Sequence, residues 1–405
     1  MTAERLLTTE EVARRLGVKK ATVYAYVSRG LLGSRRNADG KESLFAEPEV
    51  AAFVAGRKRP GAAPDAPAIH TGLTLITGTE LFYRGHPAGE LARMASFESV
   101  ATLLWTGELR HVPVAPDPEL RALAEAVTAP LPAGARLTDR LRVAVAAIAT
   151  ADRLRFDTTP AAVITRGRTI LGTMVAALPV RAPAPHGSGL AGVLWARLTD
   201  RAPAPADLVA LNAALVLLAD HDLAASTFAA RVAASTRAHP YAVVQAGLSA
   251  LDGPLHGTAS DLAYGLLTEV MRSQDAVGAI SGRLRTDGWI AGFGHPLYPA
   301  GDPRAAVLLD LLAPAADEQP AAVRAALAEV TAAIGRHSGA APTIDFALAA
   351  FALLNGMAAD AGETIFAVAR TAGWIAHALE EYADEPSRFR PNGRYAGWRP
   401  GAEGT

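Results

Sequence analysis

Apolar residues recur every three or four positions along most of the 405-residue chain, and Pro or Gly separates one such run from the next. This spacing places the apolar side chains on one face of successive helices. One run begins at Phe97 and ends at Gly107, a glycine typical of a helix C-terminus. Half of the residues are hydrophobic and Ala dominates, whereas strand-favouring runs are scarce. The pattern predicts an all-α protein with closely packed helices.

The first sixty residues carry a different pattern. A short helix is predicted to begin at Thr8 or Thr9, to bury Val12 and to end at Gly17, and a second helix follows at about 20–28. Two short helices joined by a glycine turn are typical of a helix-turn-helix. The basic residues and the Asp-Gly turn beyond the second helix predict a small wing.

Charge distinguishes this segment from the rest of the chain. It has twelve Lys and Arg against seven Asp and Glu, whereas the whole chain has a net charge of −1. The segment resembles the DNA-binding domain of MerR-like and excisionase-like proteins, whose second helix enters the major groove. The candidate DNA contacts are Lys19, Lys20, Thr22, Tyr24, Tyr26, Arg29, Arg35 and Arg36. The positive excess is modest. The alternative that this helix-turn-helix is an interaction or folding module that does not bind DNA therefore stays open.

Composition sets the domain limits and excludes some chemistry. A Pro- and Ala-rich stretch cannot support a core, so we expect a helix-turn-helix domain at 1–59 and a linker at 60–70. The chain has no Cys, which excludes disulfides, thiolate metal sites and Cys nucleophiles. The apolar stretch 208–219 is too short to span a membrane, and the N-terminus lacks the apolar core of a signal peptide. We therefore expect a soluble cytoplasmic protein.

Four residues after position 215 are candidates for chemistry. His221 follows Asp220 at the end of an apolar helix, His256 lies in Gly-Pro-Leu-His-Gly, and His295 lies in Gly-Phe-Gly-His. Turns of this kind fix the backbone and point the ring, although a single His in a turn is more often a structural residue. Asp345 has apolar neighbours on both sides. Desolvation should raise its pKa, as a general base requires.

Each of these interpretations has an alternative or a missing partner. Asp345 could instead be the N-cap of a helix that begins near Phe346. Arg370 lies on an otherwise apolar helix and needs a buried anion, either an internal carboxylate or a carboxylate of a ligand. Arg390 begins Arg-Pro-Asn-Gly-Arg. No two histidines are three or four residues apart, so no metal site is expected. No Gly-rich phosphate loop follows a strand, which disfavours P-loop and Rossmann chemistry.

Together these residues suit proton abstraction next to a carbonyl, with a neutral His as donor and arginines that clamp a substrate with several carboxylates. From about Thr71 to Gly397 the chain resembles the citrate synthase family. Seven motifs in order carry this resemblance: Phe82–Gly85, Leu103–Leu109, Asp220–Arg231, Gly253–Gly257, Gly292–His295, Asp302–Arg304, and Arg390–Pro391 with Tyr395 and Gly397. The resemblance implies an α-helical homodimer with a large domain (71–257 and 352–405) and a small domain (258–351) that closes over the substrates.

The resemblance also implies roles for the candidate residues. His256 would bond the thioester oxygen of acetyl-CoA and stabilise its enolate, Asp345 would remove the methyl proton, and His295 would polarise the ketone of oxaloacetate. The carboxylates of oxaloacetate or citrate would be held by His221, Arg304 and Arg370. Arg390 would reach across from the partner subunit. Acetyl-CoA is then a co-substrate, and no permanently bound cofactor is expected.

Some positions depart from the usual family pattern. Thr258–Ser260 replaces Gly-Ala-Asn, Pro296 replaces an Arg, Thr343–Ile344 replaces Asn-Val, and Ala347 replaces a Tyr. These changes leave the acid–base residues intact and alter the pocket wall. They keep open a 2-methylcitrate synthase acting on propionyl-CoA, or an activity like that of citryl-CoA lyase. The fused helix-turn-helix raises a further alternative, a DNA-binding regulator whose synthase-like domain senses a ligand. A sensor has no need of a base, so the complete acid–base set favours the enzyme.

Overall fold

The computed structural model describes most of the chain in two compact units, Met1–His70 and Thr71–Thr405. The described residues are 6–16, 18, 20–28, 32–36, 43–47, 50, 69–313 and 320–390. Most of the predicted linker lies outside these residues, as do Lys19, Arg29 and the motif residues Pro391, Tyr395 and Gly397.

The first unit has the predicted pair of short helices with a small antiparallel sheet. Its elements are β1 (Leu6–Thr8), α1 (Thr9–Leu16), α2 (Lys20–Ser28), β2 (Arg35–Arg36) and β3 (Ser43–Ala46), with the strands in the order β1-β3-β2. The Thr8 hydroxyl accepts from the Glu11 N–H, and the Glu11 carboxylate accepts from the Thr8 N–H, a capping box that begins α1. Val12, Val23 and Phe45 are buried in its core. The β2–β3 pair lies where the wing was predicted.

The second unit is almost entirely helical, as the apolar spacing predicts. It opens with a short antiparallel sheet of β4 (Thr74–Ile76), β5 (Leu81–Tyr83) and β6 (His86–Pro87). Its helices are α4 (Ala88–Met94), α5 (Phe97–Thr106), α6 (Pro118–Thr128), α7 (Leu137–Ala151), α8 (Pro160–Ala176), α9 (Gly189–Leu198), α10 (Pro205–Leu218), α11 (Ala225–Ser235), α12 (Pro240–Leu251), α13 (Ala259–Ser273), α14 (Ala276–Thr286), α15 (Pro303–Leu312), α16 (Ala321–Ser338), α17 (Ile344–Leu354) and α18 (Ala361–Ala383). The helix expected from Phe97 ends at Gly107, which takes a left-handed conformation with φ of 83°.

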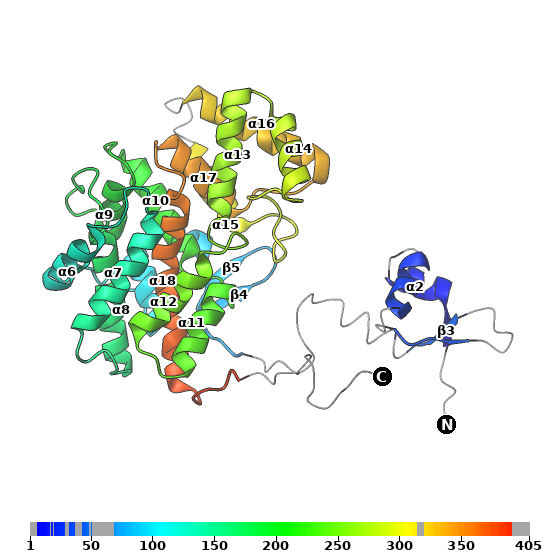
Figure 1. Cartoon of the computed structure of the whole chain (residues 1–405), viewed down its shortest axis with the longest axis horizontal. Helices are drawn as coiled ribbons and strands as arrows, with labels where there is room; N and C mark the ends of the chain where they lie inside the picture. The colour runs from blue at the N-terminus through cyan, green and yellow to red at the C-terminus, as the bar shows by residue number, and fades with distance from the viewer. Residues whose placement is uncertain are drawn as a thin grey trace, which may run out of the picture. The chain divides into compact units, whose positions relative to one another are not determined.

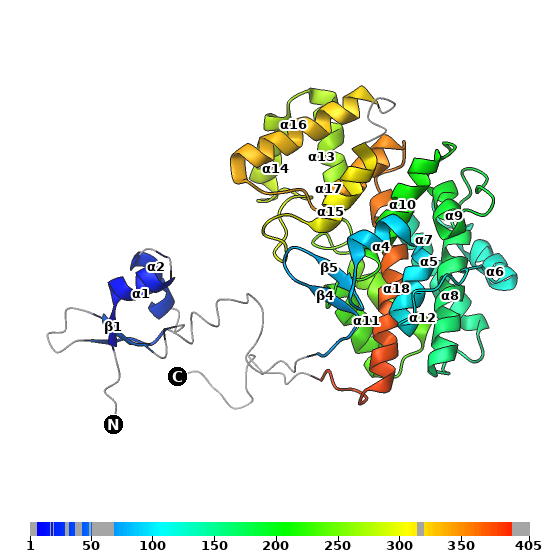
Figure 2. The same cartoon turned by 180° about the vertical axis from the view of Figure 1, so that it is seen from behind.

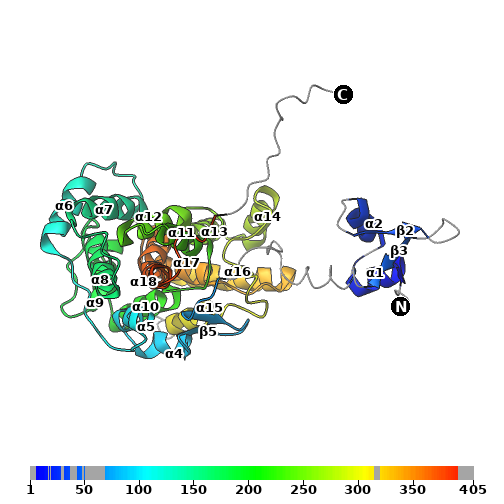
Figure 3. The ribbon, with the colours of Figure 1, turned by 90° about the horizontal axis from the view of Figure 1, so that it is seen from below.

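Helix α18 organises the main core. It runs the length of the second unit (Figures 1 and 2) and lies among other helices when the unit is seen from below (Figure 3). Helices α5, α8, α10, α11 and α12 pack against it, and almost every residue between Ala361 and Ala378 is buried. A helix that is apolar on all sides must be surrounded by others. A charged residue on α18, such as Arg370, is therefore placed inside the protein.

A second, smaller core lies beside the first. It is formed by α13, α14, α16 and α17, which lie together at the top of Figure 1. Its buried residues fall between Ala263 and Ala349, inside the range expected for a small domain. Among the described residues, no helix combines the length and the apolar character that crossing a bilayer requires.

Candidate active site

One cavity of about 300 Å³ collects most of the predicted site residues. Its wall is formed by the loop after α10, the turn before α13, the loop before α15, the start of α17 and the middle of α18. Its polar lining consists of His221, His256, His295, Arg304, Thr343, Asp345 and Arg370, and apolar residues such as Leu255, Trp289 and Phe366 complete it. Six of the seven predicted chemical residues thus meet in one place. The seventh, Arg390, is exposed and does not line this cavity.

The turn before α13 holds His256 in a defined orientation. The His256 N–H donates to the Gly253 carbonyl at 2.9 Å, and the ring Nε2 lies 2.7 Å from the hydroxyl of Ser226 on α11. The Ser226 N–H also donates to Nε2 at 3.4 Å, and the Ser226 hydroxyl accepts from the Trp374 indole, so we assign Nε2 as the acceptor of the hydroxyl proton. Burial, aided by the charge of Arg370, lowers the pKa of His256 to about 4. The ring is therefore neutral near pH 7, and Nδ1–H is available to a ligand.

Asp345 lies in the first turn of α17 and is not its N-cap. Thr343 is the cap residue, so the N-cap interpretation of Asp345 is wrong. Its Oδ2 accepts from the Thr343 hydroxyl at 3.3 Å, whereas Oδ1 is buried and has no hydrogen-bond partner. Burial raises the pKa of Asp345 to about 6, although Arg304 opposes the shift. Asp345 is therefore ionised near pH 7 and is a stronger base than an exposed aspartate.

His221 and His295 lie side by side, with ring centroids 5.4 Å apart. Burial and the neighbouring arginines lower the pKa of both rings, to about 4 for His295 and well below the usual value for His221. His295 Nδ1 accepts from the Leu297 N–H at 3.1 Å, which leaves Nε2–H as the donor of a neutral ring. The Tyr298 hydroxyl contacts His221 Nε2 at 2.9 Å. Tyr298 stands only three residues after His295, but no sequence pattern indicated this contact.

Arg304 already has a protein partner. Its Nε and Nη2 donate to the two oxygens of Asp302 at 2.9 and 2.8 Å, and both side chains are buried. The same carboxylate caps α15 and accepts from the Ile344 N–H at 3.0 Å, immediately before Asp345. Asp302 thus joins the starts of α15 and α17. The sequence analysis placed Asp302 in a motif but gave it no role.

Arg370 is the opposite case. Its Nε donates to the Leu218 carbonyl at 2.8 Å, whereas Nη1 and Nη2 are buried without a hydrogen-bond partner. Burial lowers its pKa to about 10, so it is still charged at pH 7. Within the described part of the chain it forms no ion pair, which rules out a directly bonded internal carboxylate. Because a buried unpaired cation is costly, the guanidinium is suited to a ligand carboxylate.

The predicted DNA contacts are only partly described. Lys20 is exposed but pairs with Glu10 at 3.0 Å, and Tyr24 is exposed on α2. Thr22 and Tyr26 are partly buried. The remaining candidates lie outside the described residues, either wholly or in their side chains: Lys19, Arg29, Arg35 and Arg36.

Comparison with known proteins assigns the chain that forms this pocket to a family. A family model described as the citrate synthase C-terminal domain matches residues 63–392. The chain belongs to the citrate synthase family. A second family model, described as a helix-turn-helix domain, matches residues 6–58. Both parts of the predicted resemblance are therefore confirmed, and citrate synthase family membership indicates an enzyme of the acyltransferase type.

Curated relatives and solved structures agree with this family. The chain is 30% identical to 2-methylcitrate synthase 2 of Corynebacterium glutamicum, over 78% of this chain and 88% of that protein. It is also 30% identical to the citrate synthase of Mycolicibacterium smegmatis, over 82% and 96% of the two chains. The crystal structure of citrate synthase from Pyrobaculum aerophilum superposes with a TM-score of 0.69 at 25% identity, over 82% of this chain and 91% of that one. The predicted helical fold is confirmed.

Proposed function

We propose that the chain condenses acetyl-CoA with oxaloacetate to give citrate and CoA. One observation carries the proposal. A single cavity combines a carboxylate with a raised pKa, neutral imidazoles, and a buried guanidinium whose Nη atoms have no protein partner. The first group can remove a proton from carbon, the second can stabilise the resulting enolate, and the third can hold a substrate carboxylate.

The first step is enolisation of the thioester. Asp345 takes a proton from the methyl carbon, and the C–H electron pair moves to form the enolate. His256 donates from Nδ1–H to the thioester oxygen, where the negative charge develops. A neutral imidazole suits this role, because its N–H is held in place and stabilises the enolate oxygen by a hydrogen bond without giving up its proton.

The second step joins the two substrates. The enolate carbon attacks the ketone carbon of oxaloacetate, and the C=O electron pair moves to the oxygen. His295 gives its Nε2 proton to this oxygen, which becomes the hydroxyl of citryl-CoA. His295 then regains a proton and Asp345 releases the one it took, both by exchange with solvent. Arg370, Arg304 and His221 hold the carboxylates of oxaloacetate, with Arg370 supplying its two free Nη groups. Water then hydrolyses the thioester of citryl-CoA to give citrate and free CoA.

A homodimer in the cytoplasm is part of the proposal. Arg390 would complete the site of the partner subunit, and its exposure at the end of the described residues is compatible with that role. Arg388, two residues earlier, is anchored by two hydrogen bonds to Glu381 at 2.9 and 2.6 Å. This anchor fixes the chain two residues before Arg390.

The decisive experiment is release of CoA thiol by the full chain. Because the protein has no Cys, a thiol reagent reports CoA alone. We expect CoA release that requires both acetyl-CoA and oxaloacetate. A parallel series with propionyl-CoA tests for 2-methylcitrate synthase activity, which the name of one relative indicates. The proposal fails if neither acyl-CoA releases thiol with oxaloacetate or with longer 2-oxo acids. Cleavage of citryl-CoA without net synthesis would favour the lyase alternative.

A DNA-binding regulator is the second candidate, and the helix-turn-helix unit favours it. We expect the full chain to bind DNA from its own promoter region, with affinity that falls linearly in log–log form as salt rises. Replacing Lys20 and Tyr24 together by Ala should weaken this binding, because both are exposed on α2. Gel shifts at several salt concentrations measure both effects. Absence of a shift at low salt would contradict DNA binding.

A further inference from the structure

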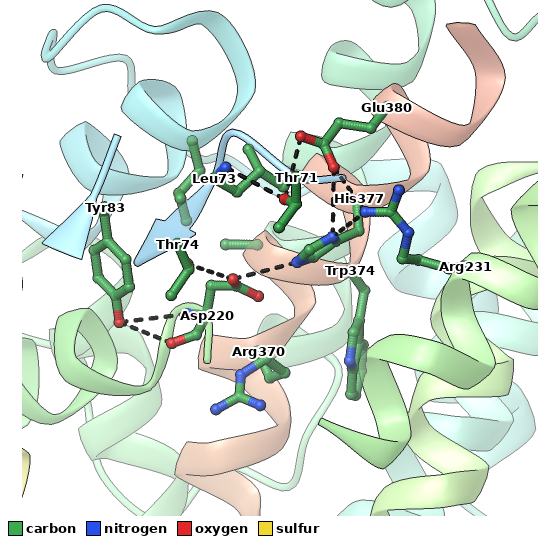
Figure 4. A network of polar contacts seen from close by, with 12 residues as sticks. Thr71, Leu73, Thr74, Tyr83, Asp220, Arg231, Arg370, Trp374, His377 and Glu380 are labelled. Atoms are coloured by element: carbon green, nitrogen blue, oxygen red, sulfur yellow. Dashed lines mark hydrogen bonds and ion pairs between the residues drawn. The ribbon is translucent and has the colours of Figure 1, made fainter. Parts of the chain in front are cut away.

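A buried polar network lies behind the pocket and takes no part in the steps above (Figure 4). It begins at Asp220, which directly precedes His221. Asp220 Oδ2 accepts from the Thr74 hydroxyl at 2.5 Å and lies 3.2 Å from His377 Nε2. Asp220 and His377 are both fully buried. Burying polar groups is costly unless they are hydrogen-bonded, and here they are bonded to one another.

The proton position on His377 follows from its other neighbour. His377 Nδ1 lies 2.6 Å from Arg231 Nη1, and a guanidinium can only donate. Nδ1 must therefore accept, and Nε2–H donates to Asp220. Arg231 is held in turn by Glu381 at 2.5 Å and Glu380 at 2.6 Å. The imidazole is thus held with its Nε2–H pointing at the Asp220 carboxylate.

Close packing brings this carboxylate against the helix that carries Arg370. The Gly373 N–H donates to the Ala219 carbonyl at 2.9 Å, and a Cβ on Gly373 would lie 2.5 Å from the same oxygen. Only glycine permits this approach. Arg370, Gly373 and His377 are spaced by three and four residues, so they share one face of α18. Figure 4 shows His377 pointing at Asp220 across a dashed contact, with Arg370 below Asp220.

We infer that Asp220 and His377 are positioning residues for the oxo-acid site, and this inference rests on the proposed function. Asp220 supplies a fixed negative charge near Arg370 without bonding to it, so Nη1 and Nη2 stay free for the ligand. The last residue of α10, Leu218, supplies the carbonyl that accepts from Arg370 Nε, and the loop that follows carries His221 into the cavity. His377 holds the carboxylate in place.

Electrostatics supports this arrangement. Burial alone would raise the pKa of Asp220, but His377, Arg370 and the Thr74 hydroxyl outweigh it and keep the pKa below its usual value. Asp220 is therefore ionised near pH 7. Its charge in turn partly offsets the effect of burial on the pKa of Arg370. A directly bonded carboxylate would stabilise Arg370 more strongly but would occupy the groups that the ligand needs.

Two substitutions test the inference. Asp220→Asn keeps the shape and an acceptor oxygen but removes the charge, and we expect the KM for oxaloacetate to rise about 10- to 100-fold. The KM for acetyl-CoA and kcat should change by less than about threefold, because the acyl-CoA groups are untouched. His377→Gln keeps a donor and an acceptor and should remain close to the parent protein. His377→Leu removes both and should resemble Asp220→Asn.

The controls separate a positioning role from a general loss of structure. Asp310→Asn removes an exposed carboxylate that pairs with Arg93 and should leave every constant unchanged. If His377→Leu does not fold, Asp220→Asn still decides. The inference is overturned if Asp220→Asn leaves the KM for oxaloacetate unchanged. It is also overturned if kcat falls and both KM values rise by the same factor. If the parent protein shows no turnover, calorimetry without acyl-CoA compares the Kd for oxaloacetate between the same variants. Failure of the proposed function is then seen separately from failure of the inference.

Discussion

Asp345→Asn is expected to lower kcat about 10²- to 10⁴-fold, the range that a positioned general base contributes. The amide has the same shape as the carboxylate but cannot accept a proton from carbon. The amide oxygen can keep the hydrogen bond from the Thr343 hydroxyl, and the NH2 group then takes the place of Oδ1, which has no hydrogen-bond partner. Steady-state CoA release measures kcat, and calorimetry should show oxaloacetate affinity within about twofold of the parent value. Undiminished turnover would exclude Asp345 as the base.

The pH profile gives an independent view of the same residue. Asp345 must be ionised to act, and its pKa is raised to about 6. We therefore expect kcat/KM to fall tenfold per pH unit below about pH 6, whereas an unperturbed aspartate would remain active to about pH 4. His256 and His295, with pKa values near 4, stay neutral over this window and add no limb of their own. An acid limb near pH 4 would contradict the assignment.

Arg370→Met is expected to raise the Kd for oxaloacetate about 10²- to 10³-fold, since the loss of one partner from a buried charge pair typically costs a few kcal/mol. The thioether side chain fills similar space but cannot bond a carboxylate. Calorimetry measures the loss directly. Arg93→Met, which removes an exposed arginine paired with Asp310, is the matched control and should bind as the parent protein does. Parent-like affinity in Arg370→Met would mean that the oxo acid binds elsewhere.

Local signals in the sequence predicted the helices well. Gly107 ends α5 in a left-handed conformation, and the Thr8–Glu11 pair begins α1, because both features depend on a few neighbouring residues. Asp345 shows where such reasoning stops. A cap is decided by backbone conformation, and Thr343 is the extended residue at the start of α17 because its N–H donates to the Gly292 carbonyl. That bond joins residues 51 positions apart in the chain, which no local pattern contains.

The site shows the same division. The motifs identified six side chains that line the cavity, but residue type alone could not separate the two arginines. Arg304 is bonded by Asp302, whereas Arg370 has no carboxylate partner for its Nη atoms. Likewise, Asp220 and His377 meet across 157 residues, and nothing near either one in the sequence indicates the contact. Partner choice is a property of the folded chain.

The unpaired Nη atoms of Arg370 also bear on the balance between stability and function. A buried guanidinium with two unpaired Nη groups destabilises the empty protein relative to one with an apolar residue at that position. Under the proposed function, binding of an oxo acid would satisfy these donors and so stabilise the folded state by mass action. The protein is thus less stable without its ligand than it would be with an apolar residue at position 370. A sequence selected for stability alone would not keep an arginine there.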